Sequence, residues 1–271
     1  MKKFKGITII SDMDGTLLND KKEISAENRK AISYFIENGG NFSIASGRIF
    51  SRLRMYHKVI EVTLPVITMN GMMIQDFSTG SVLYRERLDP NAKEYTETIL
   101  KKYPHLGLEI YTDDTVHFIQ RNRHIDKHIS DEGFNLNVCT LDEVKGEWRK
   151  VLFGCDENLL EIMEREFSYM KEKVHFTKSD AHFYEILAKG ASKGSALRHL
   201  TELAGIDPSR VIAVGDNIND LEFIEAAGAG AAVANACREV KARSRYVLTQ
   251  NNNEAPIREL VGKLENGEIV I

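Results

Sequence analysis

Residues 7–16, ITIISDMDGT, decide the fold, because they join a short apolar run to two carboxylates and a glycine. The apolar run at 7–10 predicts a short strand. Asp12 and Asp14 then lie just past the carboxyl end of that strand, where doubly wound sheets bind their ligands. Residues two apart in an extended segment point the same way, so both carboxylates are expected to converge on one metal ion or phosphate group. Taken alone, the segment is also compatible with an ordinary polar loop.

A second acidic segment follows a second apolar run. Residues 215–220, GDNIND, come directly after the predicted strand at 211–214. Their acid and amide side chains supply the hard oxygen ligands that Mg²⁺ prefers. Aspartate and asparagine are also frequent in turns, so an ordinary turn is the alternative.

Two smaller signals point to the same end of the predicted sheet. Ser46 and Gly47 follow the predicted strand at 42–45, where a hydroxyl and a backbone amide can both donate to a phosphate oxygen. Lys193 opens a predicted helix and brings an ammonium group to that edge. Each signal alone is commonly structural. Together, four strand or helix ends offer phosphate or magnesium chemistry at one edge of one sheet.

Strand and helix signals alternate over residues 1–85 and again over 188–271, which predicts an α/β core with a doubly wound, Rossmann-like parallel sheet. Residues 86–187 pair strands with helices and contain few crossover units, as in a separate α+β domain. The simplest topology is one core built from both ends of the chain, with the middle inserted as a cap. The asparagines at 251–253 are expected to form a solvated loop.

Composition excludes several classes of function. The 271 residues carry 36 basic and 40 acidic side chains, a net charge of −4, so a nucleic-acid partner is not expected. No run approaches the ~18 apolar residues that would span a bilayer, and the first apolar run is too short for a signal peptide, so a cytoplasmic protein without a membrane partner is expected. The three cysteines are widely spaced, which favours neither disulfides nor a zinc site. The sequence sets no oligomeric state.

These motifs resemble those of the haloacid dehalogenase superfamily of phosphatases, and within it the Cof-type (class IIB) sugar-phosphatase branch. Residues 12–16 match its DxDGT motif, Ser46 its threonine-or-serine motif, Lys193 its lysine motif and residues 215–220 its GDxxND motif, in the family's order. The inserted middle segment is similar in place and length to the α/β cap of this branch. Ser46 stands where threonine is commoner, and the hydroxyl remains.

The resemblance implies a magnesium-dependent phosphomonoester hydrolase that works through a phosphorylated aspartate. Asp12 would be the nucleophile and a metal ligand, and Asp14 the general acid and base, bound to the metal through its backbone carbonyl. Asp216 and Asn217 would complete the metal ligands, with Asp220 holding them in place. The residues implied for the phosphate are Met13 (through its backbone), Ser46, Gly47, Lys193 and Asn219. Crowding by Asp12 and Asp216 is expected to raise the pKa of Asp14 towards proton transfer.

The expected partner is a small phosphorylated metabolite, and its identity is open among hexose phosphates, phosphorylated polyols, pyridoxal phosphate and flavin mononucleotide. Selectivity is expected to lie in the cap, with Arg121, Asn122, His124, Lys178 and Asp180 as candidates, although each could be ordinary solvated surface. Three alternatives are a phosphomutase of the same superfamily, a receiver-like phosphoaspartate signalling protein and an inactive phosphate-sugar sensor. Asp14 and the long insertion count against a receiver, which needs neither an acid for a departing alcohol nor a cap.

Overall fold

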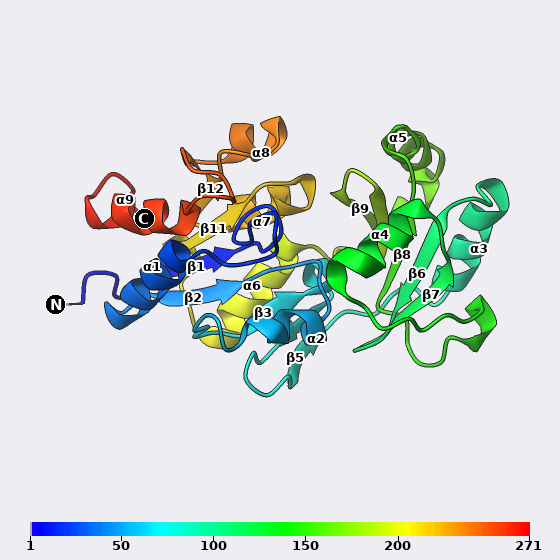
Figure 1. The fold of residues 1–271 in the computed structure, drawn as a ribbon, viewed down its shortest axis with the longest axis horizontal. Coiled ribbons are helices and arrows are strands. Elements are labelled where there is room, and N and C mark those ends of the chain that lie inside the picture. The colour runs from blue at the N-terminus through cyan, green and yellow to red at the C-terminus, as the bar shows by residue number, and fades with distance from the viewer. Residues whose placement is uncertain (1) are drawn as a thin grey trace. The chain divides into compact units, whose positions relative to one another are not determined.

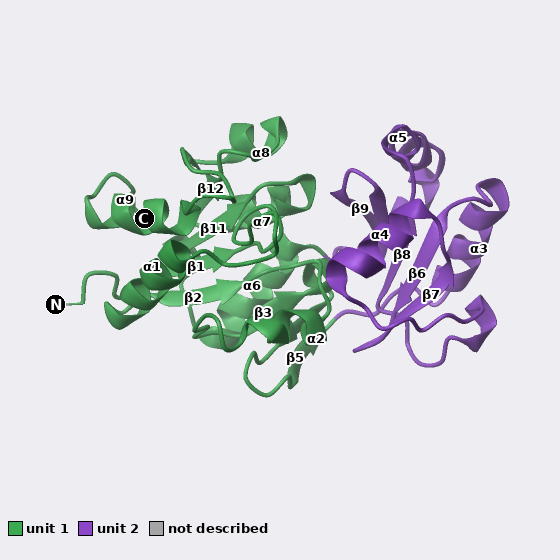
Figure 2. Cartoon of the chain, in the orientation of Figure 1, with its two compact units in different colours: residues 1–85, 192–271 green, residues 86–191 purple. Residues whose placement is uncertain are grey.

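The computed structural model describes residues 2–271 and consists of two compact units (Figure 2). Unit 1 is built from the segment that ends at Arg85 together with Ser192–Ile271, and unit 2 spans Glu86–Ala191. In the part of the chain described, no helix is long and apolar enough to cross a membrane.

Unit 1 contains a five-stranded sheet in the order β13-β12-β11-β1-β2, in which all neighbouring strands are parallel (Figure 1). Its strands are β1 (Thr8–Ser11), β2 (Asn41–Ile44), β11 (Val211–Gly215), β12 (Ala229–Ala232) and β13 (Tyr246–Val247). Every residue of β1 and β11 is buried, which explains why both strands read as continuous apolar runs and not as alternating ones. The predicted α/β class with a central parallel sheet is confirmed.

Helices cover both faces of this sheet. The crossover through α1 (Ala26–Glu37) joins β1 to β2, and the crossover through α7 (Leu221–Ala226) joins β11 to β12. These crossovers run in opposite directions along the sheet, and since such units are right-handed, the two helices lie on opposite faces. Helix α9 (Pro256–Glu265) packs against α1, and α6 (Lys193–Ala204) packs against α7. The short helices α2 (Phe50–Leu53) and α8 (Arg238–Arg243) complete the unit.

Local signals set the start of α1. The hydroxyl of Ser25 accepts a hydrogen bond from the backbone N–H of Asn28 at 3.2 Å, so Ser25 is the N-cap of this helix. Ile32 and Phe35 then point into the core, where they join apolar side chains of the sheet such as Ile9 and Phe42. This burial fixes α1 on one face of the sheet.

An antiparallel extension follows β2. Its strands are β3 (Val66–Thr68), β4 (Met73–Gln75) and β5 (Val82–Arg85). Strands β4 and β5 form an antiparallel hairpin, and its turn is held by Asp76, whose carboxylate accepts hydrogen bonds from Ser78 and Thr79. A parallel bridge between Ala45 and Ile67 attaches this extension to the edge of the main sheet.

Unit 2 has an antiparallel sheet in the order β7-β6-β8-β10-β9. Its strands are β6 (Gly107–Tyr111), β7 (Val116–Gln120), β8 (Lys150–Gly154), β9 (Val174–Asp180) and β10 (Phe183–Ala188). Its helices are α3 (Ala92–Lys102), α4 (Arg123–Glu132) and α5 (Glu157–Glu166). A separate apolar core joins one face of this sheet to α3 and α5 through side chains such as Ile99, Phe153 and Leu160. The function of unit 2 as a cap stays a prediction.

Candidate active site

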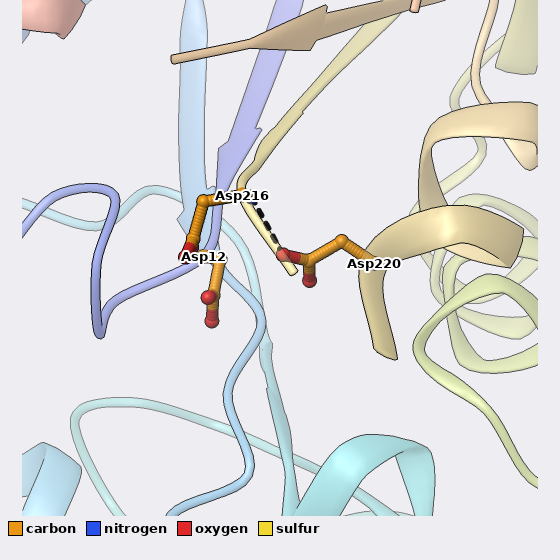
Figure 3. Close-up of side chains that lie close together, drawn as sticks. All are labelled: Asp12, Asp216 and Asp220. Atoms are coloured by element: carbon orange, nitrogen blue, oxygen red, sulfur yellow. Dashed lines mark hydrogen bonds between the residues drawn. The ribbon is translucent and has the colours of Figure 1, made fainter. Parts of the chain in front are cut away.

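The carboxyl ends of β1 and β11 bring two acidic segments together (Figure 3). The strands pair in register, Ser11 opposite Val214, and the backbone N–H of Asp12 donates to the carbonyl of Val214 at 2.8 Å. Asp12, Asp216 and Asp220 each offer a carboxylate oxygen, and these oxygens lie within 4.8 Å of one another. We call these three residues the carboxylate cluster.

The side chain of Asp220 stabilises the turn after β11 by accepting hydrogen bonds from its backbone. It is fully buried, and its Oδ2 accepts hydrogen bonds from the backbone N–H groups of Asp216 (2.9 Å) and Asn217 (3.2 Å). A side chain at Gly215 would place its Cβ 2.6 Å from Asp220, so only glycine lets the carboxylate lie under the turn. Asp220 therefore orients the backbone on which Asp216 stands.

Lys193 lies between two members of the carboxylate cluster. Its Nζ is 2.7 Å from Oδ1 of Asp12 and 2.6 Å from Oδ1 of Asp220, and the residue is 1% exposed. Burial disfavours the charged lysine, but the two carboxylates outweigh burial and raise the pKa of Lys193 above its usual value. Ser192 caps α6 by accepting a hydrogen bond from the N–H of Ser195 at 3.1 Å. This cap fixes the first turn of the helix, from which the side chain of Lys193 extends to the carboxylate cluster.

The carboxylate cluster carries more negative charge than Lys193 offsets. Burial, together with the neighbouring Asp220, raises the pKa of Asp12 well above its ordinary value and that of Asp216 to about 7. Thr16 donates to Oδ1 of Asp216 at 2.6 Å and orients it. Buried carboxylates that repel one another, with oxygen as their only donor atom, fit a hard divalent cation. The cluster can therefore hold a metal ion.

Asp14 is not a member of the carboxylate cluster, although its charge acts on Asp216, and its convergence with Asp12 on one metal ion or phosphate stays a prediction. The chain turns directly after Asp12, and the carbonyl of Met13 accepts from the N–H groups of Leu17 and Leu18 at 3.0 and 2.8 Å. The alternation of an extended strand therefore ends before Asp14.

The carboxylate of Asp14 is paired with two cations. Its oxygens lie 2.6 Å from Nε and 2.7 Å from Nη2 of Arg48, and 2.7 Å from Nζ of Lys22. Burial alone would raise the pKa of Asp14, but these cations outweigh it and hold the pKa well below its usual range. The expected upward shift is therefore wrong, because Arg48 and Lys22 act on Asp14 more strongly than burial does.

The residues proposed for phosphate binding lie around the end of β2. The backbone N–H of Ala45 donates to the carbonyl of Ser11 at 2.9 Å, so Ser46 follows β2 at the edge that carries Asp12. A Cβ at Gly47 would lie 3.1 Å from the side chain of Asn70, and Asn219 donates from Nδ2 to Oδ1 of Asn70 at 3.1 Å. Oδ1 of Asn219 is buried and has no hydrogen-bond partner among residues 2–271. The structure thus brings Ser46, Gly47 and Asn219 to one place through Asn70.

Sequence reasoning missed several residues next to this site. Lys22 and Arg48 were not assigned, although Arg48 directly follows Ser46-Gly47 and a cation there was a usable signal. The expectation of a solvated loop at 251–253 is wrong for Asn252, which is 7% exposed and donates to the carbonyl of Leu18 at 3.1 Å. Its role could not be seen from the local sequence because its partner lies near the other end of the chain.

The selectivity candidates all have partners inside unit 2. Asn122 caps α4, accepting from the N–H groups of His124 and Ile125 at 3.1 Å, and donates to the carbonyl of Gly154 at 2.9 Å. The side chain of His124 lies 2.8 Å from Asp156. Asn122 therefore has a structural role whatever else it does.

The other candidates are more accessible. Arg121 pairs with Asp126 at 2.6 Å and its side chain is 47% exposed. Lys178 lies 3.3 Å from Glu164, and Asp180 accepts from the N–H of His182 at 3.1 Å. Arg121 precedes α4, whereas Lys178 and Asp180 belong to β9.

This fold and site place the chain in a known class. Residues 9–260 match the haloacid dehalogenase-like hydrolase family, and the chain belongs to that family. YxeH of Bacillus subtilis, a relative named as a phosphatase, is 33% identical, and the match covers 94% of this chain and 97% of YxeH. The 5-amino-6-(5-phospho-D-ribitylamino)uracil phosphatase YwtE of the same organism is 30% identical, over 96% of this chain and 98% of YwtE. The crystal structure of TM0651 from Thermotoga maritima aligns with a TM-score of 0.78 at 29% identity, over 95% of this chain and 97% of that one.

Proposed function

We propose that this chain hydrolyses a small phosphorylated metabolite with Mg²⁺ by way of a phosphorylated Asp12. The family and the relatives make the chain a phosphomonoester hydrolase. The observation that carries the mechanism is the position of Asp12, which is buried, lies 2.7 Å from Lys193 and belongs to the carboxylate cluster.

Charge decides whether a carboxylate can attack a phosphate ester. The oxygens of a phosphoryl group repel an incoming carboxylate, so that repulsion must be offset before attack. Lys193 supplies one fixed positive charge, and Mg²⁺ held by Asp12, Asp216, Asn217 and the backbone carbonyl of Asp14 would supply the rest. Because Lys193 binds Oδ1 of Asp12, Oδ2 is the oxygen proposed to attack phosphorus.

The proposed reaction has two steps. In the first, Asp12 bonds to phosphorus and the bond from phosphorus to the leaving oxygen breaks. Asp14 donates a proton to that oxygen, for which it has to be protonated in the substrate complex although Arg48 and Lys22 favour its ionised form. In the second, water attacks phosphorus, Asp14 takes the proton, and inorganic phosphate leaves while the Asp12 carboxylate is restored. Ser46, Gly47, Asn219 and the backbone of Met13 are proposed to hold the phosphoryl oxygens. The contacts of Asn70 support this grouping, because its Oδ1 accepts from Asn219 and its backbone N–H donates to the carbonyl of Ser46.

The proposed substrate is a sugar phosphate or a similar phosphomonoester, in keeping with the phosphorylated ribityl compound named for YwtE. We further propose that unit 2 selects the leaving group, with Arg121, Lys178 and Asp180 as the most accessible of the candidates. Replacing one of them by alanine should change KM among sugar phosphates and leave hydrolysis of p-nitrophenyl phosphate nearly unaltered.

The test of the function is steady-state phosphate release from a panel of phosphorylated metabolites with Mg²⁺. Many turnovers per protein molecule are expected for at least one sugar phosphate. Isomer exchange with little free phosphate would show a phosphomutase, and a single phosphorylation without turnover would show a receiver-like protein. Either result would contradict the proposal.

A further inference from the structure

The contacts of Asp14 use both of its carboxylate oxygens. Arg48 donates from Nε to Oδ2 and from Nη2 to Oδ1, and Lys22 donates from Nζ to Oδ1. The two cations differ in accessibility: the side chain of Arg48 is 7% exposed and that of Lys22 is 40% exposed. A two-point guanidinium contact fixes the plane of a carboxylate as well as its position.

Arg48 reaches Asp14 from a rigid segment. Its backbone N–H donates to Oγ of Ser46 at 3.2 Å, and its carbonyl accepts from the N–H of Met69 at 3.0 Å. The loop after β2 is thus tied to the end of β3, and the position of Arg48 follows from that of the sheet.

Lys22 reaches Asp14 from a tight turn over residues 19–23. The backbone φ of Lys22 is +61°, a left-handed conformation that residues other than glycine rarely adopt. Oδ1 of Asn19 accepts from the N–H groups of Lys21 and Glu23 at 2.9 Å, and the hydroxyl of Tyr56 donates to the carbonyl of Lys22 at 2.9 Å. Contacts that hold a residue in a costly conformation next to a reactive group indicate a functional position.

A distant loop braces this turn. Asn252 donates to Oδ1 of Asp20 at 3.1 Å, and Asn253 donates to Oδ2 of Asp20 at 3.0 Å. The backbone N–H of Asp20 donates in return to Oδ1 of Asn253 at 3.0 Å. The turn that carries Lys22 is therefore attached to the body of unit 1 at both sides.

We propose, building on the function proposed above, that Arg48 and Lys22 are positioning residues that keep the Asp14 carboxylate out of the carboxylate cluster and aimed for proton transfer. Asp14 is only two residues from Asp12, and a divalent cation attracts any carboxylate within reach. The paired cations oppose that attraction. The Asp14 side chain then stays available to the leaving group and does not become a further metal ligand.

A double-mutant cycle tests whether Arg48 acts through Asp14. Arg48→Gln is made in the native chain and in Asp14→Asn, and phosphorylation of the protein is measured with a hexose phosphate and with p-nitrophenyl phosphate. In the native background we expect a loss of ~10²-fold on the hexose phosphate and much less on the nitrophenyl ester, because only the alkoxide needs an acid. In Asp14→Asn, Arg48→Gln should add no further loss on either ester.

Metal affinity gives a readout that does not need turnover. Mn²⁺ binding is followed by electron paramagnetic resonance in the same four proteins. Removing Arg48 should tighten Mn²⁺ binding by about tenfold where Asp14 can swing to the ion, because groups that orient the surroundings of a metal commonly change its affinity by ~10–100-fold. In the Asp14→Asn background, removing Arg48 should change the Mn²⁺ affinity less, because only the loss of one positive charge near the ion then acts on it.

Controls and a second variant keep the test decisive. Lys21→Met and Arg54→Gln remove exposed cations from the same two segments and should leave both readouts unchanged. If Arg48→Gln does not fold, Lys22→Met is used, and it should show the same pattern to a smaller extent. Equal losses on both esters in both backgrounds, or Mn²⁺ affinity independent of Asp14, would overturn the proposal. Absence of phosphate release from the native chain would refute only the proposed function, since the Mn²⁺ cycle still reports on Asp14.

Discussion

Lys193 and Asp12 form an ion pair, 2.7 Å between Nζ and Oδ1, in which both side chains are almost wholly buried. They belong to the two chain segments that build unit 1, and the parallel sheet brings them together. Removing one partner of a buried pair is costly, because the remaining charge has no compensation. The pair therefore links stability to the site.

We expect Lys193→Met to lower the free energy of unfolding of unit 1 by about 3–5 kcal/mol in the presence of a chelator. The variant keeps the length of the side chain but leaves the carboxylate cluster without its fixed cation. Mg²⁺ should restore part of the loss, so the Tm of the variant should depend on Mg²⁺ more strongly than that of the native protein. Lys189→Met removes an exposed lysine nearby in sequence and is the control. A Tm unaffected by Lys193→Met would contradict this account of the pair.

Metal removal should abolish turnover. The carboxylate cluster provides oxygen ligands only, so Mg²⁺ should restore activity after chelation. The measurement is phosphate release before and after exhaustive chelation, and after Mg²⁺ is returned. Asp216→Asn should weaken Mg²⁺ binding, while Asp207→Asn, an exposed residue that precedes β11, serves as the control. Full activity of the chelated protein would refute a metal-dependent mechanism.

Substitutions of Asp12 and of Asp14 should impair different steps of the reaction. Asp12→Ala removes the nucleophile, so neither turnover nor phosphorylated protein is expected. Asp14→Asn keeps the nucleophile and the backbone carbonyl but removes the proton donor. It should retain far more of its phosphorylation rate with p-nitrophenyl phosphate than with a sugar phosphate, since general acid assistance is worth ~10²–10⁴ in rate only for a poor leaving group.

Mass spectrometry of acid-quenched samples checks this difference. Water attack is slow in Asp14→Asn, so phosphorylated protein should accumulate. Equal rate losses on both esters with no trapped intermediate would show that Asp14 is not an acid or base.

A pH effect on stability is expected in unit 2. Nδ1 of His128 on α4 lies 2.9 Å from Oε1 of Glu109, which is fully buried on β6. Burial lowers the pKa of His128 and the nearby Lys150 does so too, but Glu109 and Glu132 outweigh them and the pKa is raised above 6.5. The charged histidine therefore stabilises the fold below pH 6.5, and this contribution is lost as pH rises through the raised pKa.

His128→Gln removes the charge while an amide can still donate to Glu109. The difference in Tm between the native protein and this variant should be largest in mildly acidic buffer and should shrink as pH rises through the raised pKa. His105→Gln changes a histidine of unit 2 that precedes β6 and should show no such trend. A Tm difference that is constant across this range would contradict the assignment of charge to His128.

The pattern of the sequence was sufficient for the core of the site. Continuous apolar runs predicted β1 and β11, and the carboxylates that follow them had to meet because parallel strands end at one edge of the sheet. Lys193 could be placed there too, since a helix start with its cap can be read from local sequence. These features depend on backbone periodicity and capping, which neighbouring residues determine.

Only the tertiary structure decided where Asp14 points and what holds it. A rule for extended strands fails once the chain turns at Met13, and no local pattern shows that Arg48 and Lys22 approach the same carboxylate. Asn252 braces the Lys22 turn from near the other end of the chain. Such contacts join loops that are distant in sequence, so they are set by the closure of the whole domain around its sheet and cannot be read from the residues beside them.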